Sequence, residues 1–103
     1  MVSPMASFVV ETFVPGGSQD RFTADVDRIR LATDAHVVVE GRVHHVRSYL
    51  VPGDEMGFHV MEADSGEVVA RVTEIAGIEV ERIVEAVSVG PGRFADDAME
   101  GDR

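Results

Sequence analysis

Cysteine is absent from this chain of 103 residues, and so are long apolar runs. Without cysteine the protein can form no disulfide, no thiolate metal site and no cysteine nucleophile, and this composition fits a reducing compartment. The longest apolar runs, such as Phe8–Val10 and Val37–Val39, have three residues, whereas a membrane-spanning helix needs about 20. The opening residues MVSPMASF also lack the basic start and the apolar run of a secretory signal. The sequence therefore predicts a soluble, cytoplasmic protein without a membrane partner.

Basic residues are scarce as well. The chain has 9 Lys and Arg against 19 Asp and Glu, which gives a formal net charge of −10. Proteins bind nucleic acids largely by neutralising phosphates with Lys and Arg, so this balance argues against a nucleic-acid partner. A negative net charge favours solubility and is compatible with the binding of cations or of a basic partner. The length fits one domain with one modest core.

The stretch Val43–Ala63 organises the chain. Two segments of period-two alternation flank the turn formers Pro52–Asp54, which predicts a β-hairpin. Successive side chains of a strand point to opposite faces, so one parity of each strand is assigned to the core. The expected core residues are Val46, Leu50, Phe58 and Val60. The opposite face then carries His45, Arg47, Tyr49, His59 and Met61.

Alternation and helical periodicity predict three further elements. Ala6–Val14 alternates as a first strand, and Arg82–Val89 alternates as the last one. Between the hairpin and the last strand, Asp64 stands three residues before Glu67, as in a capping box that opens a helix. Gly77 follows the apolar stripe of this helix and is expected to end it.

Another helix is expected from about Gln19, with Ser18 as its N-cap. Its C-terminal end has two interpretations. His36–Glu40 has the β-favouring valines of a separate strand, whereas the apolar stripe continues through Val37 and Gly41 stands where a C-terminal glycine belongs. We favour one long helix to about Glu40.

The resulting order, strand-helix-strand-strand-helix-strand, is the ferredoxin-like pattern of an α+β sandwich. It predicts a four-stranded antiparallel sheet in the order 4-1-3-2, with both helices on one face. We expect this domain over residues 6–90, an N-terminal extension over 1–5 and an acidic flexible tail over 91–103. One layer of helices leaves the other sheet face open, and an open face normally finds a partner. We therefore expect a homodimer that packs open face to open face.

Carboxylates join the histidines on the expected open face. Glu11 does so because the Phe and Val parity of its strand takes the core. Glu85 does so if Val84 and Ala86 are buried, an assignment that avoids an unpaired buried carboxylate. Two imidazoles and two carboxylates suit Ni²⁺, Zn²⁺, Fe²⁺ or Cu²⁺. The expected metal ligands are Glu11, His45, His59 and Glu85, with Arg47, Tyr49 and Met61 beside them as ligand-binding residues.

Two other interpretations stay open. In the first, the protein is a small-molecule-binding enzyme of the dimeric α+β barrel type, cyclase-like or isomerase-like. His59 or His45 would then act as acid or base, and Arg47 and Tyr49 would hold an anionic or carbonyl oxygen. In the second, the open face serves dimerisation alone and carries no chemistry.

Three segments resemble a known family. They are FVVETFVPG (Phe8–Gly16), RSYLVPGDEMGFHVMEA (Arg47–Ala63) and AGIEVERIVEAV (Ala76–Val87). They are similar to small actinobacterial and proteobacterial nickel-binding, nickel-responsive proteins of ferredoxin-like fold, many of them labelled a domain of unknown function. The resemblance covers about residues 7–89. It implies a dimeric α+β sandwich with Ni²⁺ as the bound ion, and it supports the long first helix.

The matching positions include three of the residues already singled out. Glu11 stands in the family's V-E-x-[FY] element, Tyr49 in its S-Y element and Glu85 in its I-V-E-A element. The chain departs from the pattern at Gly57, where relatives commonly carry cysteine before the aromatic residue. The resemblance therefore implies nickel binding without a thiolate ligand.

Overall fold

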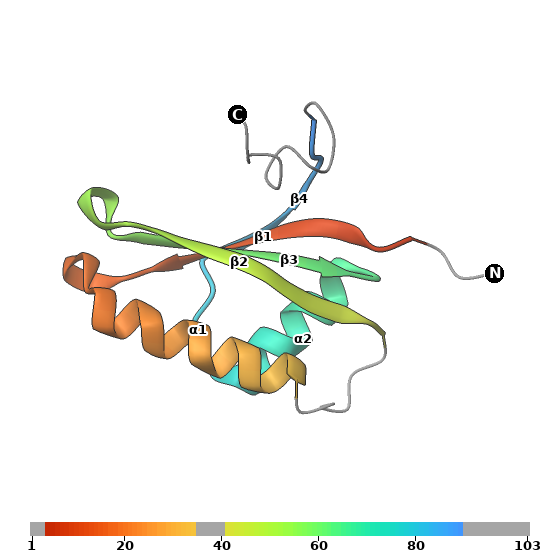
Figure 1. Ribbon diagram of the computed structural model, residues 1–103, viewed down its shortest axis with the longest axis horizontal. Coiled ribbons are helices and arrows are strands. Elements are labelled where there is room, and N and C mark those ends of the chain that lie inside the picture. Colours follow the sequence, from red (N-terminus) through yellow and green to blue (C-terminus); the bar gives the residue numbers. More distant parts are fainter. Residues whose placement is uncertain (1–3, 35–40, 90–103) are drawn as a thin grey trace, which may run out of the picture.

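The computed structural model describes residues 4–34 and 41–89. It shows an α+β fold in which one four-stranded antiparallel sheet carries two helices on a single face (Figure 1). The elements are β1 (Ala6–Phe13), α1 (Gln19–Asp34), β2 (Val43–Val51), β3 (Met56–Ala63), α2 (Gly66–Ala76) and β4 (Arg82–Ala86). The strand order β2-β3-β1-β4 is the predicted order counted from the other edge. The arrangement is consistent with the ferredoxin-like pattern.

Helix α1 begins as the sequence predicts. The Ser18 hydroxyl accepts a hydrogen bond from the backbone N–H of Arg21 at 3.3 Å and so caps the helix. The part of α1 that the structure describes ends at Asp34. Both the predicted extension to Glu40 and the rival strand over His36–Glu40 fall on residues 35–40, outside the described ranges.

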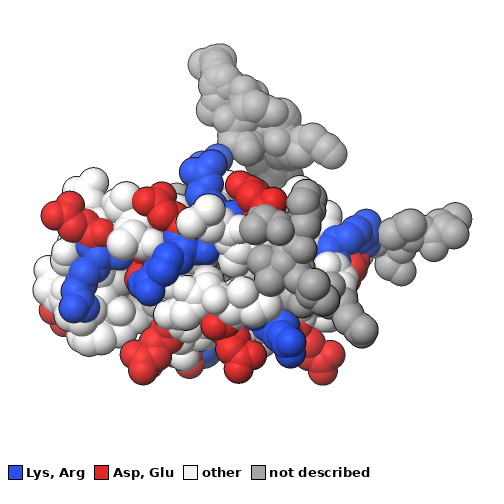
Figure 2. Space-filling model, turned by 90° about the horizontal axis from the view of Figure 1, so that it is seen from below, with Lys and Arg blue, Asp and Glu red and all other residues white. Residues whose placement is uncertain are grey.

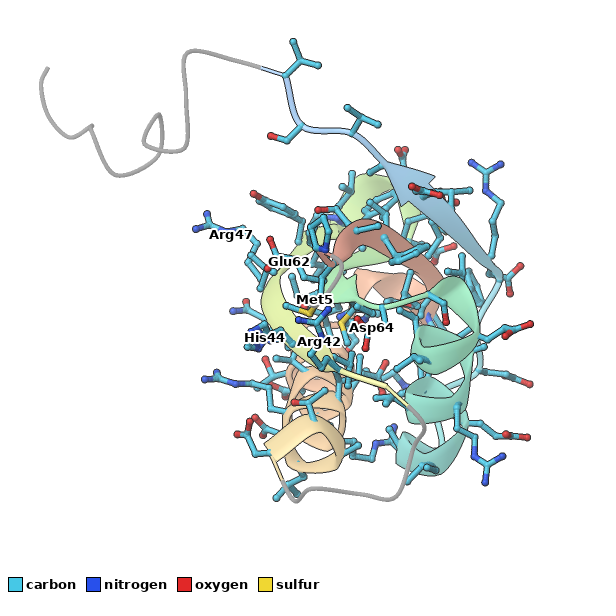
Figure 3. All side chains as sticks on the ribbon, turned by 90° about the vertical axis from the view of Figure 1, so that its right-hand side faces the viewer. Met5, Arg42, His44, Arg47, Glu62 and Asp64 are labelled. Atoms are coloured by element: carbon cyan, nitrogen blue, oxygen red, sulfur yellow. The ribbon has the colours of Figure 1, made fainter. Side chains whose placement is uncertain are left out.

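Helix α2 uses a different cap from the predicted one. The N-cap is Ser65, whose hydroxyl accepts from the N–H of Val68 at 3.3 Å. Asp64 instead binds Arg42, whose backbone N lies 2.6 Å and whose Nε lies 2.9 Å from its carboxylate oxygens. This pair ties the start of β2 to the end of β3 (Figure 3). Gly77 ends α2 as predicted, with a left-handed φ of 74°.

The core fills the space between the sheet and the helices. Its fully buried members include Val10 from β1, Ile29 from α1, Met61 from β3 and Val69 from α2. The outer surface of the helices carries acidic and basic side chains side by side (Figure 2). None of the helices in the described ranges is both long enough and apolar enough to cross a membrane.

The predicted parity of β3 is wrong. Gly57, His59, Met61 and Ala63 are buried on the helix-covered face, while Phe58 and Val60 lie half-buried on the open face. A Cβ atom added at Gly57 would lie 2.6 Å from Cε1 of Phe22 and 2.8 Å from Oγ1 of Thr12. Helix α1 therefore approaches β3 so closely that the space under Phe22 accepts no side chain at position 57.

A β-bulge makes the predicted parity of β2 wrong at its start. His45 pairs with Met61, whereas Arg47 pairs with Val60, so β2 carries one extra residue between them. The bulge places His45 on the helix-covered face instead of the open one. After the bulge, Arg47 and Tyr49 lie on the open face, as predicted.

The predicted parity of β4 is wrong as well. Glu85 pairs with the buried Phe8, so it belongs to the helix-covered face, where its position on the edge strand leaves it exposed. Ile83 pairs with Val10 and packs against the core. The sequence assignment failed here because both parities of this strand are largely apolar. Glu11 lies on the open face, as predicted, and bonds Arg82 at 3.1 Å.

Candidate functional site

Two histidines meet through one serine on the helix-covered face. Nε2 of His45 lies 2.8 Å from Oγ of Ser48, and the same oxygen lies 2.7 Å from Nδ1 of His59. The bulge in β2 creates this geometry, because it brings residues 45 and 48 to one face, and Ser48 pairs directly with His59. We call this group the His45–Ser48–His59 chain.

His59 is the buried end of this chain. Its side chain is fully buried at 0% exposure, and its ring stacks on Phe22 with centroids 5.2 Å apart and an interplanar angle of 18°. Burial lowers the pKa of His59 to about 4, assisted by the charge of His45 and opposed by Asp25. His59 is therefore neutral at physiological pH.

The second ring nitrogen of His59 fixes the direction of the hydrogen bonds. Nε2 of His59 finds no hydrogen-bond partner in the described part of the chain. An orphaned buried N–H is rarer than an under-satisfied acceptor, which favours a proton on Nδ1 and a bare Nε2. His59 then donates to Oγ of Ser48, and the Ser48 hydroxyl donates to Nε2 of His45. In this arrangement Nε2 of His45 accepts a hydrogen bond from Ser48. Nε2 of His59 is buried and has no hydrogen-bond partner in the described residues with which it could exchange a proton.

His45 is the open end of the chain. It is half-buried, and it lines a cleft of about 650 Å³ between α1 and β2. Burial lowers the pKa of His45, the charge of Arg30 lowers it further, and Asp34 opposes both. The cleft has the volume typical of small-molecule sites, about 300–1,000 Å³.

The walls of this cleft, the α1–β2 cleft, mix apolar and polar side chains. The apolar wall consists of Phe22, Val26, Val46, Leu50 and Pro52, and the polar groups are Gln19, Thr23, Arg30, His45, Arg47 and Ser48. None of these described lining residues is acidic. Ligand pockets combine apolar walls with convergent polar groups, and this cleft has both, with a larger share of polar residues than is usual.

The predicted metal ligands do not come together on one face. Glu11 faces the open side and already pairs with Arg82, and the other three predicted ligands belong to the helix-covered side. Glu85 stands there on the edge strand β4, two strands away from β3. Within residues 4–34 and 41–89, no three His, Cys, Asp or Glu side chains converge on a point that would hold a metal. The open-face metal site expected from the sequence is therefore not assembled.

The predicted ligand-binding residues divide in the same way. Met61 is buried in the core at 0% exposure and contributes packing instead of a binding surface. Tyr49 is 51% exposed on the open face, opposite Phe58. Arg47 also lies on the open face and extends outward from the rim of the α1–β2 cleft (Figure 3).

Sequence reasoning missed two residues of the site. Ser48 shares the parity of Val46 and Leu50, which alternation assigns to the core, and Phe22 fits the apolar stripe of the first helix. A local signal exists for Ser48, because a hydroxyl assigned to a core position needs a polar partner. Phe22 gave no comparable signal, since its contact with His59 joins residues 37 positions apart.

Comparison with known proteins bears on the fold. No family model matches the chain, and no curated protein matches it. Among solved structures, it is similar to the Streptomyces coelicolor A3(2) protein of the study "Crystal structure analysis of SCO4226", with a TM-score of 0.68 and 21% sequence identity. The match covers 82% of this chain and 100% of that chain. Membership of a nickel-binding family stays a prediction, and the chain shares its α+β fold with the Streptomyces protein.

Proposed function

We propose that this protein binds a small molecule in the α1–β2 cleft and carries out acid–base chemistry on it, of the isomerase or cyclase kind. The observation that carries the proposal is the His45–Ser48–His59 chain, which ends at the wall of this cleft. A proton-donating group must lie within hydrogen-bond reach of the substrate atom on which it acts. Burial lowers the pKa of His45, so its ring is neutral, and because Nε2 accepts from Ser48 the ring proton is on Nδ1.

Each member of the chain has a separate task in this proposal. His45 donates its Nδ1–H to an oxygen of the bound molecule, because it is the histidine that lines the cleft. Ser48 holds the His45 ring by its hydrogen bond at 2.8 Å. His59 positions the Ser48 hydroxyl from below, held in place by the Phe22 ring. His59 is thus a positioning residue.

Spectral mapping of ligand binding tests the cleft. In backbone ¹H–¹⁵N correlation spectra recorded with a library of fragment-sized molecules, the hits are expected to shift signals of residues 22–26 and 45–50. Ser48→Ala is expected to lower the affinity for these hits about tenfold, which corresponds to the loss of about one hydrogen bond. The matched control is Ser7→Ala, which removes a half-buried serine hydroxyl from β1 and is expected to leave the affinity unchanged. Hits that gather on the open sheet face would contradict the proposal.

Solvent exchange tests the acid–base step separately. Hits that carry an acidic C–H group are incubated with the protein in D₂O, and deuterium uptake is followed by ¹H NMR. His45→Gln is expected to abolish the uptake while the signals of the cleft still shift. No uptake for any bound hit would contradict the acid–base step and leave the binding site in place.

Nickel binding is a second candidate, at a different place from the one the sequence predicts. Nε2 of His45 and Nδ1 of His59 both face Oγ of Ser48, and neutral imidazoles are ligands for Ni²⁺. Nδ1 of His59 would have to give up its proton to bind the ion. The residues fit the ion only in part, because two imidazoles leave most of its coordination sphere to other ligands. Titration with Ni²⁺ distinguishes the candidates. A rise in melting temperature that is lost in His45→Ala and retained in His44→Ala would favour nickel over the small molecule.

We further propose that a second copy of this chain covers the open sheet face. Exposed or half-buried apolar side chains line it: Val9, Phe13, Tyr49, Val51, Met56, Phe58, Val60 and Val84. Its carboxylate Glu11 is already paired with Arg82, so burial would leave no unpaired charge at that point. The strands have 8, 9, 8 and 5 residues, and at about 3.3 Å per residue and about 4.8 Å between strands they present about 480 Å² per copy. Two copies then bury about 950 Å², close to the lower limit of about 1,000 Å² for a specific interface.

Light scattering coupled to size-exclusion chromatography tests this second copy. The wild-type chain is expected to elute with the mass of a dimer, and Phe58→Glu is expected to give a monomer because it places a charge in the middle of the face. The control is Leu31→Glu, at a side chain that is 69% exposed on α1, and this variant is expected to stay dimeric. A monomeric wild type at about 100 μM, well above the dissociation constant of a stable dimer, would contradict the proposal.

A further inference from the structure

The α1–β2 cleft has a charge opposite to that of the chain as a whole. The protein carries 19 acidic residues against 9 basic ones, yet Arg30 and Arg47 line this cleft and no described acidic residue does. Within the described ranges, neither guanidinium forms a salt bridge. Such an inversion in an acidic protein requires an explanation, because free guanidinium groups beside an apolar wall are typical of sites that bind anions.

We infer that the ligand of this cleft is a small carboxylic acid with an apolar body, an inference that rests on the proposed ligand-binding function. Arg30 of α1 lines the cleft, as His45 does, whereas Arg47 of β2 stands at the rim with its side chain extending outward on the open face. Arg30 is close enough to lower the pKa of His45, after the larger effect of burial. Asp34, which opposes this effect, is not among the residues that line the cleft.

The rest of the cleft suits the apolar body of such an acid. Phe22 and Val26 from α1 face Val46 and Leu50 from β2 across it. A planar guanidinium matches a carboxylate with two parallel hydrogen bonds, and the apolar wall excludes the water that would compete with them. The ligand would lie with its carboxylate at Arg30 and its body beside Phe22, within reach of His45.

Four probes test the ligand class on the full chain by NMR titration. They are phenylacetate, its neutral isostere phenylacetamide, the cation phenethylammonium and acetate. Titration of the cleft signals is expected to give phenylacetate an affinity at least tenfold higher than that of phenylacetamide, the difference that a charge-assisted hydrogen bond predicts. Acetate is expected to bind more weakly because it lacks the apolar body, and phenethylammonium is expected not to bind.

Arg30→Gln is expected to remove the tenfold preference for the acid and to leave the affinity for phenylacetamide as it is. The matched control is Arg21→Gln, another exposed arginine of α1 that does not line the cleft, and it is expected to keep the preference. Equal binding of the acid and the amide at the cleft would overturn the ligand class and leave the proposed function standing. If none of the four probes shifts the signals of the cleft, both the ligand class and the small-molecule site are wrong.

Discussion

Acidification from about pH 7 to about pH 4 is expected to lower the free energy of unfolding by about 3 kcal/mol through His59 alone. The folded protein holds the pKa of His59 at about 4, while an unfolded chain restores the ordinary value of 6.5. Between these two values the unfolded chain binds a proton that the folded chain does not bind. The stability is therefore fully present above about pH 6.5 and is lost as the pH falls toward about 4.

The physical cause is burial. The imidazole lies under Phe22 and away from water, so its charged form is disfavoured there. The positive charge of His45 acts in the same direction, whereas the Asp25 carboxylate opposes it. The stability that Asp64 contributes is present at higher pH and is lost mainly below pH 3.8, its ordinary pKa, because its hydrogen bonds to Arg42 lower the pKa of its carboxyl in the folded protein. The two effects therefore separate along the pH axis.

Urea unfolding at a series of pH values measures this effect. His59→Asn keeps a side-chain N–H that can donate to Ser48, and it is expected to flatten the slope between about pH 6.5 and about pH 4. The overall stability of this variant also falls, so the slope is the readout. His44→Asn makes the same change at an exposed histidine and is expected to leave the slope as in wild type. Equal slopes in all three proteins would show that His59 is not buried as a neutral imidazole.

Replacing Phe22 by alanine is expected to cost about 3–5 kcal/mol of stability, the usual cost of removing a buried phenylalanine. Gly57→Ala is expected to cost about 1–3 kcal/mol, because its new methyl group would lie 2.6 Å from Cε1 of Phe22. The double variant is expected to lose at least about 1 kcal/mol less than the sum of the two, since removal of the ring relieves the main clash. Chemical denaturation of the four proteins completes this cycle.

The control for this cycle is Gly53→Ala. A Cβ atom at Gly53 meets nothing within 4 Å, so this change is expected to stay within about 0.5 kcal/mol of wild type. Strict additivity of Phe22→Ala and Gly57→Ala would contradict the packing of α1 on β3. The same contact explains why position 57 carries glycine, because Phe22 occupies the space that a larger side chain would need.

The order of elements could be predicted from the sequence, because it depends on local signals. Alternation in β1 and in the hairpin, the turn at Pro52–Asp54 and the glycine at position 77 all led to the correct elements. The strand order follows from this sequence of elements, since sandwiches of this class have few alternatives. The cap of α2 was wrong by one residue because Asp64 binds Arg42 instead, and a contact between residues 22 positions apart leaves no local signal.

The candidate site could not be predicted from alternation alone. In β3 both parities contain large apolar residues, so hydrophobicity does not decide which face is buried. The close approach of α1 decides it, through the space between Phe22 and Gly57. In β2 the bulge shifts the pattern by one residue, and every side chain before the bulge changes face. These two effects moved His45 and His59 together to the helix-covered side, so they still meet there.

The most direct test of this account is the titration of the imidazole rings, followed by long-range ¹H–¹⁵N NMR spectra from about pH 8 to about pH 4. We expect His59 to remain neutral, with its proton on Nδ1, until the pH approaches its pKa of about 4, and Ser48→Ala to change the ring nitrogen signals of both His45 and His59. If instead His59 titrates near 6.5 like an exposed histidine, and Ser48→Ala leaves both rings unchanged, the His45–Ser48–His59 chain is not formed.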